Sequence, residues 1–256
     1  MRVLSLLALA CVLVSSACTA DPGPDAAERD APRFGPWYGS LEAGARWVEN
    51  AHTHDSRLGA VSLSGAQFSA GFDASPTVGF TLGRWLQQGM RVEGEFNFGS
   101  NRLARVDIER DGGLGARLGA ASLSGDHFDA RGSLDSYHAM ANVFYEGEYR
   151  GFYPYVGGGV GVAVLKAHKA RLVSLQTAQP IALASEVMLS KDTEAVMAWQ
   201  VGGGVAYPLT QRLSATVDYR YLAAADDPEF DFAGGAGRLR TAYATHNVML
   251  ALRFRF

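Results

Sequence analysis

The feature that most constrains the fold of this 256-residue chain is a two-residue alternation of apolar and polar side chains. In Arg91–Gly99, for example, Val92, Phe96 and Phe98 alternate with charged and amide side chains. Successive side chains of a β-strand point to opposite faces, so this period predicts strands. We expect an all-β fold with eight strands, at Trp37–Val48, Thr77–Leu86, Arg91–Gly99, Ser136–Tyr145, Tyr155–Leu165, Thr193–Tyr207, Arg212–Tyr221 and Asn247–Phe256.

The links between these segments alternate strictly between short and long. Three are tight, near residues 87–90, 146–151 and 208–210, whereas four are long, at about residues 49–75, 101–133, 166–192 and 223–241. Transmembrane barrels have short periplasmic turns and longer external loops, whereas a soluble β-sandwich has no reason for such regularity. The sequence therefore predicts an eight-stranded antiparallel transmembrane up-and-down β-barrel over residues 36–256, with short periplasmic turns and four long external loops.

Composition agrees with this class of protein and argues against two others. Hydrophobic residues make up 48% of the chain, yet beyond the N-terminus no apolar run reaches the roughly 18 residues of a spanning helix. The formal net charge of −3 and the lack of a basic cluster argue against nucleic acid as a partner. Aromatic residues gather near the strand ends, as in the interfacial girdles of membrane barrels, and they include Trp37, Trp85, Tyr145, Tyr153 and Tyr207 at the short-turn end and Trp47, Tyr137, Trp199 and Tyr221 at the other.

The N-terminus has the order of a secretory signal peptide. Arg2 precedes the apolar run Val3–Val14, and small residues follow up to Ala20, so we expect a signal peptide over residues 1–20. Residues 21–35 are rich in proline and acidic residues and predict a flexible periplasmic lead-in. A second interpretation makes Cys18 a lipid-attachment cysteine, although Ser15 stands where that signal favours leucine.

Five motifs of the chain resemble a known family, namely Ala141–Tyr145, Pro154–Gly161, Trp199–Val205, Asp218–Tyr221 and His246–Phe256. Together they are similar to the small outer-membrane barrels that include opacity proteins and related surface antigens, although Ala251 stands where that family often has glycine. The resemblance implies eight strands and a bacterial outer-membrane location, and the terminal Phe254 and Phe256 resemble the signal read by barrel-insertion machinery. It does not imply one activity, because members differ mainly in their loops.

The polar face of the strands predicts a charged barrel interior. An eight-stranded barrel is just wide enough for side chains to fill it, so charges inside must be paired. We expect Glu42 to pair with Arg253, because the first and last strands close the barrel. The predicted lumen charges are Glu42, Arg46, Arg91, Glu93, Glu95, Asp218, Arg220, Arg253 and Arg255.

Three functions from different classes fit this interpretation. The favoured one is a structural or surface-interaction protein that has a filled lumen, contacts outer-membrane lipids and displays its loops to a host or cell-surface ligand. The second is a small passive channel whose conductance depends on Glu93, Glu95 and Arg220. The third is a lipid A-modifying enzyme at the external strand ends. It would use His138 with Ser136, and Asp135 as the orienting carboxylate, or His246 with Thr245. We expect no cofactor and no metal, since the loop histidines lack the spacing of metal ligands.

One internal repeat stands out in the external loops. Residues Arg57–Phe68 recur in closely similar form as Arg117–Phe128. Inherited duplication is the simpler explanation. The sharper hypothesis is that the two copies form a paired binding surface.

Overall fold

The computed structural model describes residues 36–49, 51–54, 57–58, 61–62, 66–86, 89–112, 116, 122, 124–176, 193–231 and 238–256. The predicted signal peptide, the lead-in and Cys18 lie outside these residues. The strands are β1 (Trp37–Val48), β2 (Ala51–His54), β3 (Arg57–Leu58), β4 (Val61–Ser62), β5 (Ala66–Phe72), β6 (Ser75–Trp85), β7 (Met90–Asp111), β8 (His127–Glu146), β9 (Tyr153–Gln176), β10 (Thr193–Pro208), β11 (Leu213–Ala224), β12 (Glu229–Asp231), β13 (Arg238–Thr241) and β14 (Ala244–Arg255).

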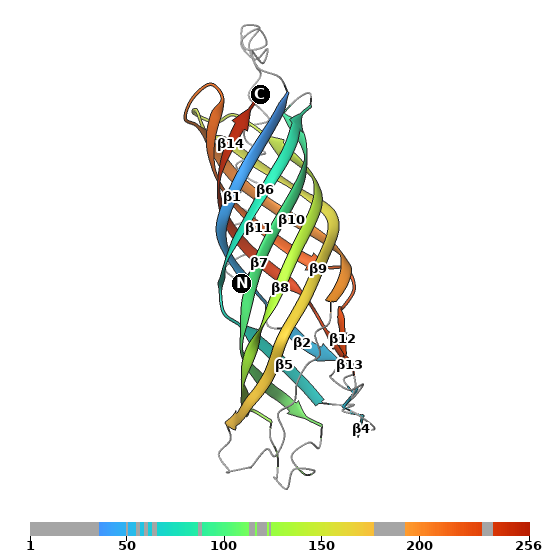
Figure 1. Cartoon of the computed structure of the whole chain (residues 1–256). Coiled ribbons are helices and arrows are strands. Elements are labelled where there is room, and N and C mark those ends of the chain that lie inside the picture. Colours follow the sequence, from blue (N-terminus) through green and yellow to red (C-terminus); the bar gives the residue numbers. More distant parts are fainter. Residues whose placement is uncertain are drawn as a thin grey trace.

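Eight of these strands close into one antiparallel ring, as predicted. The order around the ring is β1, β6, β7, β8, β9, β10, β11 and β14, and β14 pairs with β1 to complete it (Figure 1). At the closure Leu41 lies opposite Leu252. The all-β, eight-stranded fold class is therefore confirmed. Within the described ranges, no helix is long and apolar enough to cross a membrane.

The outside of the ring is apolar and the inside is polar. Leu41 on β1 is 74% exposed, whereas its neighbour Glu42 is only 5% exposed. The same contrast holds on β14, where Leu250 is 61% exposed and Asn247 is buried. A water-soluble domain has the opposite arrangement, so this distribution suits a wall that faces lipid.

Three tight turns join strands at the end of the barrel where the chain terminates. Gly89 has a φ of 76°, and a Cβ there would lie 2.5 Å from the Glu146 carbonyl oxygen, so the first turn requires glycine. In the third turn the Thr210 hydroxyl accepts hydrogen bonds from the backbone N–H groups of Arg212 and Leu213, at 3.2 and 3.0 Å. We call this the short-turn end.

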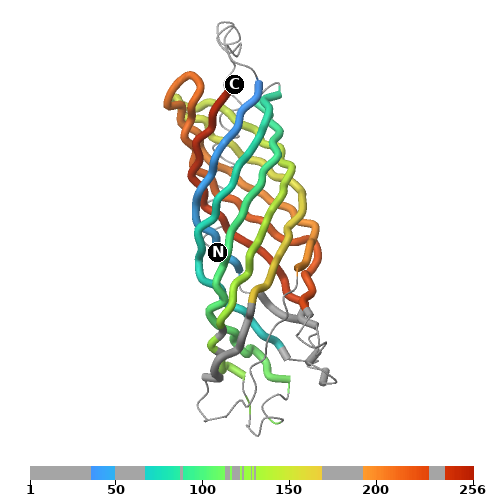
Figure 2. The backbone as a smooth tube through the Cα atoms, viewed as in Figure 1, coloured from blue at the N-terminus to red at the C-terminus, as the bar shows by residue number. Residues whose placement is uncertain are grey.

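The other end differs from the prediction of four long loops. β7, β8 and β9 run well beyond the ring, into the stretches around 101–133 and 166–176 that the sequence assigns to loops. Residues 49–75 and 223–241 also contain strands, and these extend the sheet in the order β12-β13-β2-β5-β7 (Figures 1 and 2). We name the distal sheet as β12, β13, β2 and β5 together with β7 beyond Asn101, β8 before Leu134 and β9 beyond Ala167.

Irregular pairing explains why the alternation is hard to follow in the distal sheet. The register of β7 with β8 shifts between Arg102 and Arg105, and that of β8 with β9 shifts between Asp129 and Ala130 and again before Ser133. Each extra residue moves the following side chains to the opposite face, which breaks the two-residue period.

The two sequence repeats end on opposite edges of the same strand. Phe68, at the end of the first copy, pairs with Ile108 of β7, whereas Phe128, at the end of the second, pairs with Val106. The copies therefore flank β7 on either side. About half of their remaining residues lie outside the described ranges.

Candidate functional site

The lumen of the ring is the candidate site, because eight of the nine predicted lumen charges are buried inside it. Arg255, the ninth, is half-buried at the short-turn end, where its guanidinium carbon lies 5.3 Å from the ring centre of Trp85. The interior is arranged in successive layers along the barrel, which begin at the short-turn end.

The first layer is built around Arg91. Its guanidinium forms an ion pair with Glu93 and donates a hydrogen bond to the Tyr38 hydroxyl at 2.7 Å. Its carbon also lies 4.5 and 4.6 Å from the ring centres of Phe144 and Tyr155. Aromatic faces attract cations, so these rings stabilise the buried guanidinium in addition to its carboxylate partners.

Arg253 completes this layer, and its partner differs from the predicted one. Arg253 forms an ion pair with Glu146 at 3.1 Å, whereas Glu42 pairs with Arg220, so the expected Glu42–Arg253 pair is wrong. The register explains the difference, because Ser40, not Glu42, lies opposite Arg253. Arg253 is thus one step nearer the short-turn end, within reach of Glu146.

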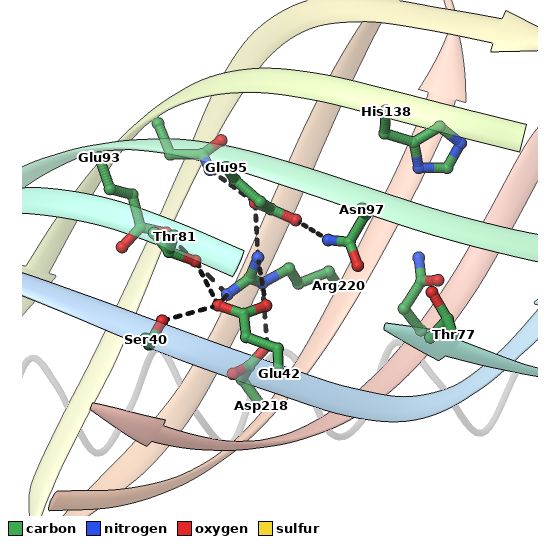
Figure 3. A network of polar contacts seen from close by, with 12 residues as sticks. Ser40, Glu42, Thr77, Thr81, Glu93, Glu95, Asn97, His138, Asp218 and Arg220 are labelled. Atoms are coloured by element: carbon green, nitrogen blue, oxygen red, sulfur yellow. Dashed lines mark hydrogen bonds and ion pairs between the residues drawn. The ribbon is translucent and has the colours of Figure 1, made fainter. Parts of the chain in front are cut away.

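The second layer is a carboxylate cluster around Arg220 (Figure 3). The guanidinium lies 2.5 Å from Glu95, 2.9 Å from Asp218 and 3.4 Å from Glu42, measured between nitrogen and oxygen. Glu93 approaches to 3.9 Å and links this layer to Arg91. All five side chains are buried, so several negative charges share one cation away from water.

Neutral donors compensate for the excess of carboxylates. Asn142 and Gln200 each donate to the same oxygen of Glu95 at 2.7 Å. Ser40 donates to Glu42 at 3.1 Å, and Tyr155 donates to Asp218 at 3.1 Å. Buried charges are tolerated only when such hydrogen bonds complete their shells, so these residues are part of the network.

The third layer surrounds Arg46, which is fully buried and has no carboxylate in ion-pair distance among the described residues. Its partners are neutral: it donates to Asn247 at 2.7 Å, to Ser136 at 2.5 Å and to His138 Nδ1 at 3.4 Å. His138 Nδ1 must accept this bond, so its Nε2 proton faces the Tyr243 hydroxyl at 3.0 Å.

The last layer is an apolar plug, which sequence reasoning missed. It fills the end of the lumen next to the distal sheet, and Phe230 of β12 and Tyr243 join it from outside the ring strands. On the inward face of β9, glycines are followed by Ala163 and Leu165, and this change from glycine to larger apolar residues is the signal that was missed. The plug consists of Val48, Leu134, Met140, Ala163, Leu165, Ala167, Val196, Ala198, Leu222, Phe230 and Tyr243.

Inward glycines make room for the large side chains. A Cβ on Gly157 would lie 2.1 Å from the Val143 carbonyl oxygen and 2.7 Å from the Phe144 ring. One on Gly159 would lie 2.1 Å from the Asn142 amide oxygen and 2.3 Å from the Ala141 carbonyl oxygen. The glycine-rich run of β9 thus lets the backbone of β8 approach closely and leaves space for the bulky side chains on it.

The structure separates the residues of the proposed enzymatic sites. Ser136 and His138 face the lumen, whereas Asp135 faces outwards, where it accepts a hydrogen bond from Ser100 and pairs with His168. Asp135 therefore does not orient His138. Thr245 and His246 also lie on opposite faces, because Thr245 is fully buried and His246 is on the outer surface.

His246 has its own partners on the outer surface. Its Nε2 lies 2.8 Å from Glu49, and its Nδ1 lies 2.6 Å from the Tyr219 hydroxyl. Its ring also packs against Tyr221, with ring centres 5.1 Å apart. A carboxylate, an imidazole and a hydroxyl are thus connected at the rim of the barrel, in the order of an acid–base relay.

Comparison with known proteins agrees with this architecture. The family model described as outer membrane protein beta-barrel domain matches residues 7–256. The crystal structure of Neisserial surface protein A is similar with a TM-score of 0.50 and 11% identity, over 87% of this chain and 98% of that one. OprG from Pseudomonas aeruginosa is similar with a TM-score of 0.50 and 15% identity, over the same shares of the two chains. No curated protein sequence matches the chain. At these identities the structural likeness concerns the fold alone.

Proposed function

Because the chain belongs to the outer membrane protein β-barrel family, a family of the bacterial outer membrane, we propose that it is a non-conducting barrel that acts through its cell-surface face. Its role is to present the distal sheet and the loops on it for adhesion, envelope integrity or contact with a host. The barrel itself serves as the anchor in the membrane.

The filled lumen is the observation that carries this proposal. Arg91, Arg220 and Arg46 each stand at the centre of a buried layer, and the plug follows them towards the distal sheet. A water-filled path would have to displace ion pairs in two layers and apolar side chains in the last. Breaking a buried ion pair and hydrating an apolar core are both costly.

The distal sheet supports the surface role. β7, β8 and β9 pass from the ring into the sheet without interruption, so the platform is rigidly continuous with the membrane anchor. Binding residues commonly lie on loops that a rigid scaffold positions. The ends of the two repeat copies, at Phe68 and Phe128 on either side of β7, belong to this platform.

The terminal strand supports a role for barrel-insertion machinery as an assembly partner. Phe254 and Phe256 are both exposed on the outer face of the barrel, at the end of the strand that closes the ring. In that position they are accessible before closure. Substituting both by alanine should slow insertion in cells while leaving refolding in detergent intact.

Single-channel recording in a planar lipid bilayer tests the closed lumen. The refolded protein, checked for folding by heat-modifiable gel mobility, should give a silent bilayer in which added gramicidin still conducts. Steady current steps that change in Glu95→Gln would instead establish a water path and the channel function.

A second candidate, modification of a membrane lipid, rests on the connected Glu49, His246 and Tyr219. Their relay lies on the outer wall, where a lipid could reach it. This candidate predicts that His246→Asn and Tyr219→Phe each abolish a change in the lipid A of expressing cells. Identical lipid A mass spectra with and without the wild-type protein would rule it out.

A further inference from the structure

The outer wall changes abruptly from apolar to charged where β7, β8 and β9 enter the distal sheet. One lateral row of paired residues, Phe98, Tyr137 and Val164, is aromatic or apolar, and the rings of Phe98 and Tyr137 lie 4.9 Å apart. These residues continue the apolar band below them. They mark the edge of the surface suited to acyl chains.

The next two rows on the same face carry polar and basic side chains. Ser100, Asp135 and Lys166 form the first row, because β7, β8 and β9 pair in that register. Arg102, Ser133 and His168 form the second. We name these six residues the headgroup shelf.

The buried neighbours of these residues establish that the shelf faces outwards. Leu134 and Leu165 belong to the plug, and Ser136 bonds Arg46 in the lumen. Strand residues alternate between faces, so Asp135 and Lys166 point to the outer side. Arg102 is exposed and lies next to Asn101, which is fully buried.

The charge of the shelf is positive and partly unmatched. Asp135 is engaged within the shelf, because it accepts from Ser100 at 2.6 Å and pairs with His168 at 3.0 Å. In the described part of the chain, no acidic side chain forms an ion pair with Arg102 or Lys166. Two cations, with serine hydroxyls beside them, are therefore available to an external anion.

The depth of the shelf matches a lipid headgroup. Side chains on one face of a strand repeat about every 6.6 Å, so the two rows lie within about 13 Å of the aromatic row along the strand, and nearer along the membrane normal because barrel strands tilt. Elsewhere on the rim the described outward residues are largely aromatic, such as Trp47, Trp199 and Tyr221, and His246 already has Glu49 as partner. The cations are thus concentrated on one side.

We propose that the headgroup shelf binds the phosphate of an anionic lipid in the outer leaflet, with Arg102 and Lys166 as the phosphate ligands and the Phe98–Tyr137–Val164 row under its acyl chains. The ligand class is a phosphorylated glycolipid such as lipid A, whose sugar hydroxyls can bond Ser133 and Ser100. This inference does not depend on whether the lumen conducts.

Native mass spectrometry of the refolded full chain with added bisphosphorylated lipid A tests the proposal. Arg102→Ser/Lys166→Ser should lower lipid A retention about thirtyfold at low salt, because each basic residue near an anionic surface contributes roughly five- to sixfold in affinity. The charge-preserving variant Arg102→Lys/Lys166→Arg should retain lipid A. The matched control Arg84→Ser/Arg150→Ser, which removes two exposed arginines at the short-turn end, should also retain it.

Three results would overturn the proposal. The first is equal retention by wild type and the Arg102→Ser/Lys166→Ser variant, provided that heat-modifiable mobility shows both folded. The second is equal retention of phosphatidylcholine, which has no net charge. The third is full displacement of lipid A by millimolar inorganic phosphate, which would make the shelf a site for soluble anions.

Discussion

The two halves of the lumen are filled in different ways. Towards the short turns, Arg91 and Arg220 organise carboxylates, amides and hydroxyls into layers of directional bonds. Towards the distal sheet, Leu134, Leu165 and Leu222 pack into the apolar plug. The outer wall is apolar along the polar half and beside the plug as far as the row of Phe98, Tyr137 and Val164, so below the headgroup shelf the contrast concerns the interior alone.

The two halves of the lumen therefore have different roles in the fold. A strand that slips by one residue in the polar half would move its charges into lipid, where each costs about 2–4 kcal/mol near the midplane, so the polar half specifies register. The plug specifies register less strongly, since several outward neighbours of its residues, such as Val162 and Met197, are apolar as well. What the plug supplies is a dry seal beside the surface platform.

The largest effect is expected from Arg220→Met, which removes the cation that Glu42, Glu95 and Asp218 share. The carboxylates would remain buried without compensation, and the free energy of unfolding should fall by about 3–5 kcal/mol. Urea unfolding in lipid vesicles measures the change. Arg255→Met is the matched control, and because Arg255 is half-buried at the mouth its effect should stay near or below about 1 kcal/mol. Equal losses for the two variants would mean that the cluster does not organise the polar half.

The next effect is expected from Leu165→Ala in the plug. Leu165 is fully buried, so the substitution loses apolar contact and leaves a cavity, at a cost of about 2–5 kcal/mol. The outward Leu250→Ala is the control, and it should cost less because lipid fills the space that leucine leaves. If the two losses in urea unfolding were equal, the plug would not be a packed core.

The sequence was sufficient to predict the eight-stranded ring and to predict that the charged side chains point into it. Both follow from a two-residue period, which any regular strand shows, and from the alternation of short and long links. It was insufficient for the ion-pair partners. A shift of two residues in the register of β1 with β14 decides whether Glu42 or Ser40 lies opposite Arg253. Which side chains meet across a lumen depends on strand tilt and stagger, and no local pattern records them.

The distal sheet and the plug show the same limit. Bulges near Arg102 and Asp129 reset the alternation, so the extensions of β7 and β8 resemble loops in sequence. Phe230 enters the plug from β12, a short strand outside the ring. The residues next to it in the sequence show no alternation that would predict a buried position. Long-range packing places such residues, which is why periodicity missed them.

A smaller effect is expected from Gly159→Ala, which tests whether inward glycines are needed to seat the polar half. The new Cβ would lie 2.1 Å from the side-chain amide oxygen of Asn142 and 2.3 Å from the backbone carbonyl oxygen of Ala141. The amide nitrogen of the same Asn142 donates a hydrogen bond to Glu95. Overpacking of this kind should cost about 1–3 kcal/mol in urea unfolding. Gly94→Ala is the matched control, since its Cβ would meet nothing closer than the Leu82 carbonyl oxygen at 4.0 Å. A neutral Gly159→Ala would show that Asn142 moves freely and that the layer is loosely packed.

The smallest effect is expected from Tyr38→Phe, which removes one hydroxyl and keeps the aromatic ring beside Arg253. That hydroxyl donates to Glu93 at 2.6 Å and accepts from Arg91 at 2.7 Å. The direct ion pair between Arg91 and Glu93 remains, so the loss should be that of a hydrogen bond to charged groups, about 1–2 kcal/mol in urea unfolding. Tyr207→Phe, on the exposed rim at the same end, should change nothing measurable. A loss for Tyr38→Phe as large as that for Arg220→Met would show that the Arg91 layer depends on the hydroxyl more than on its ion pair, and the polar half would then be one cooperative network instead of two linked layers.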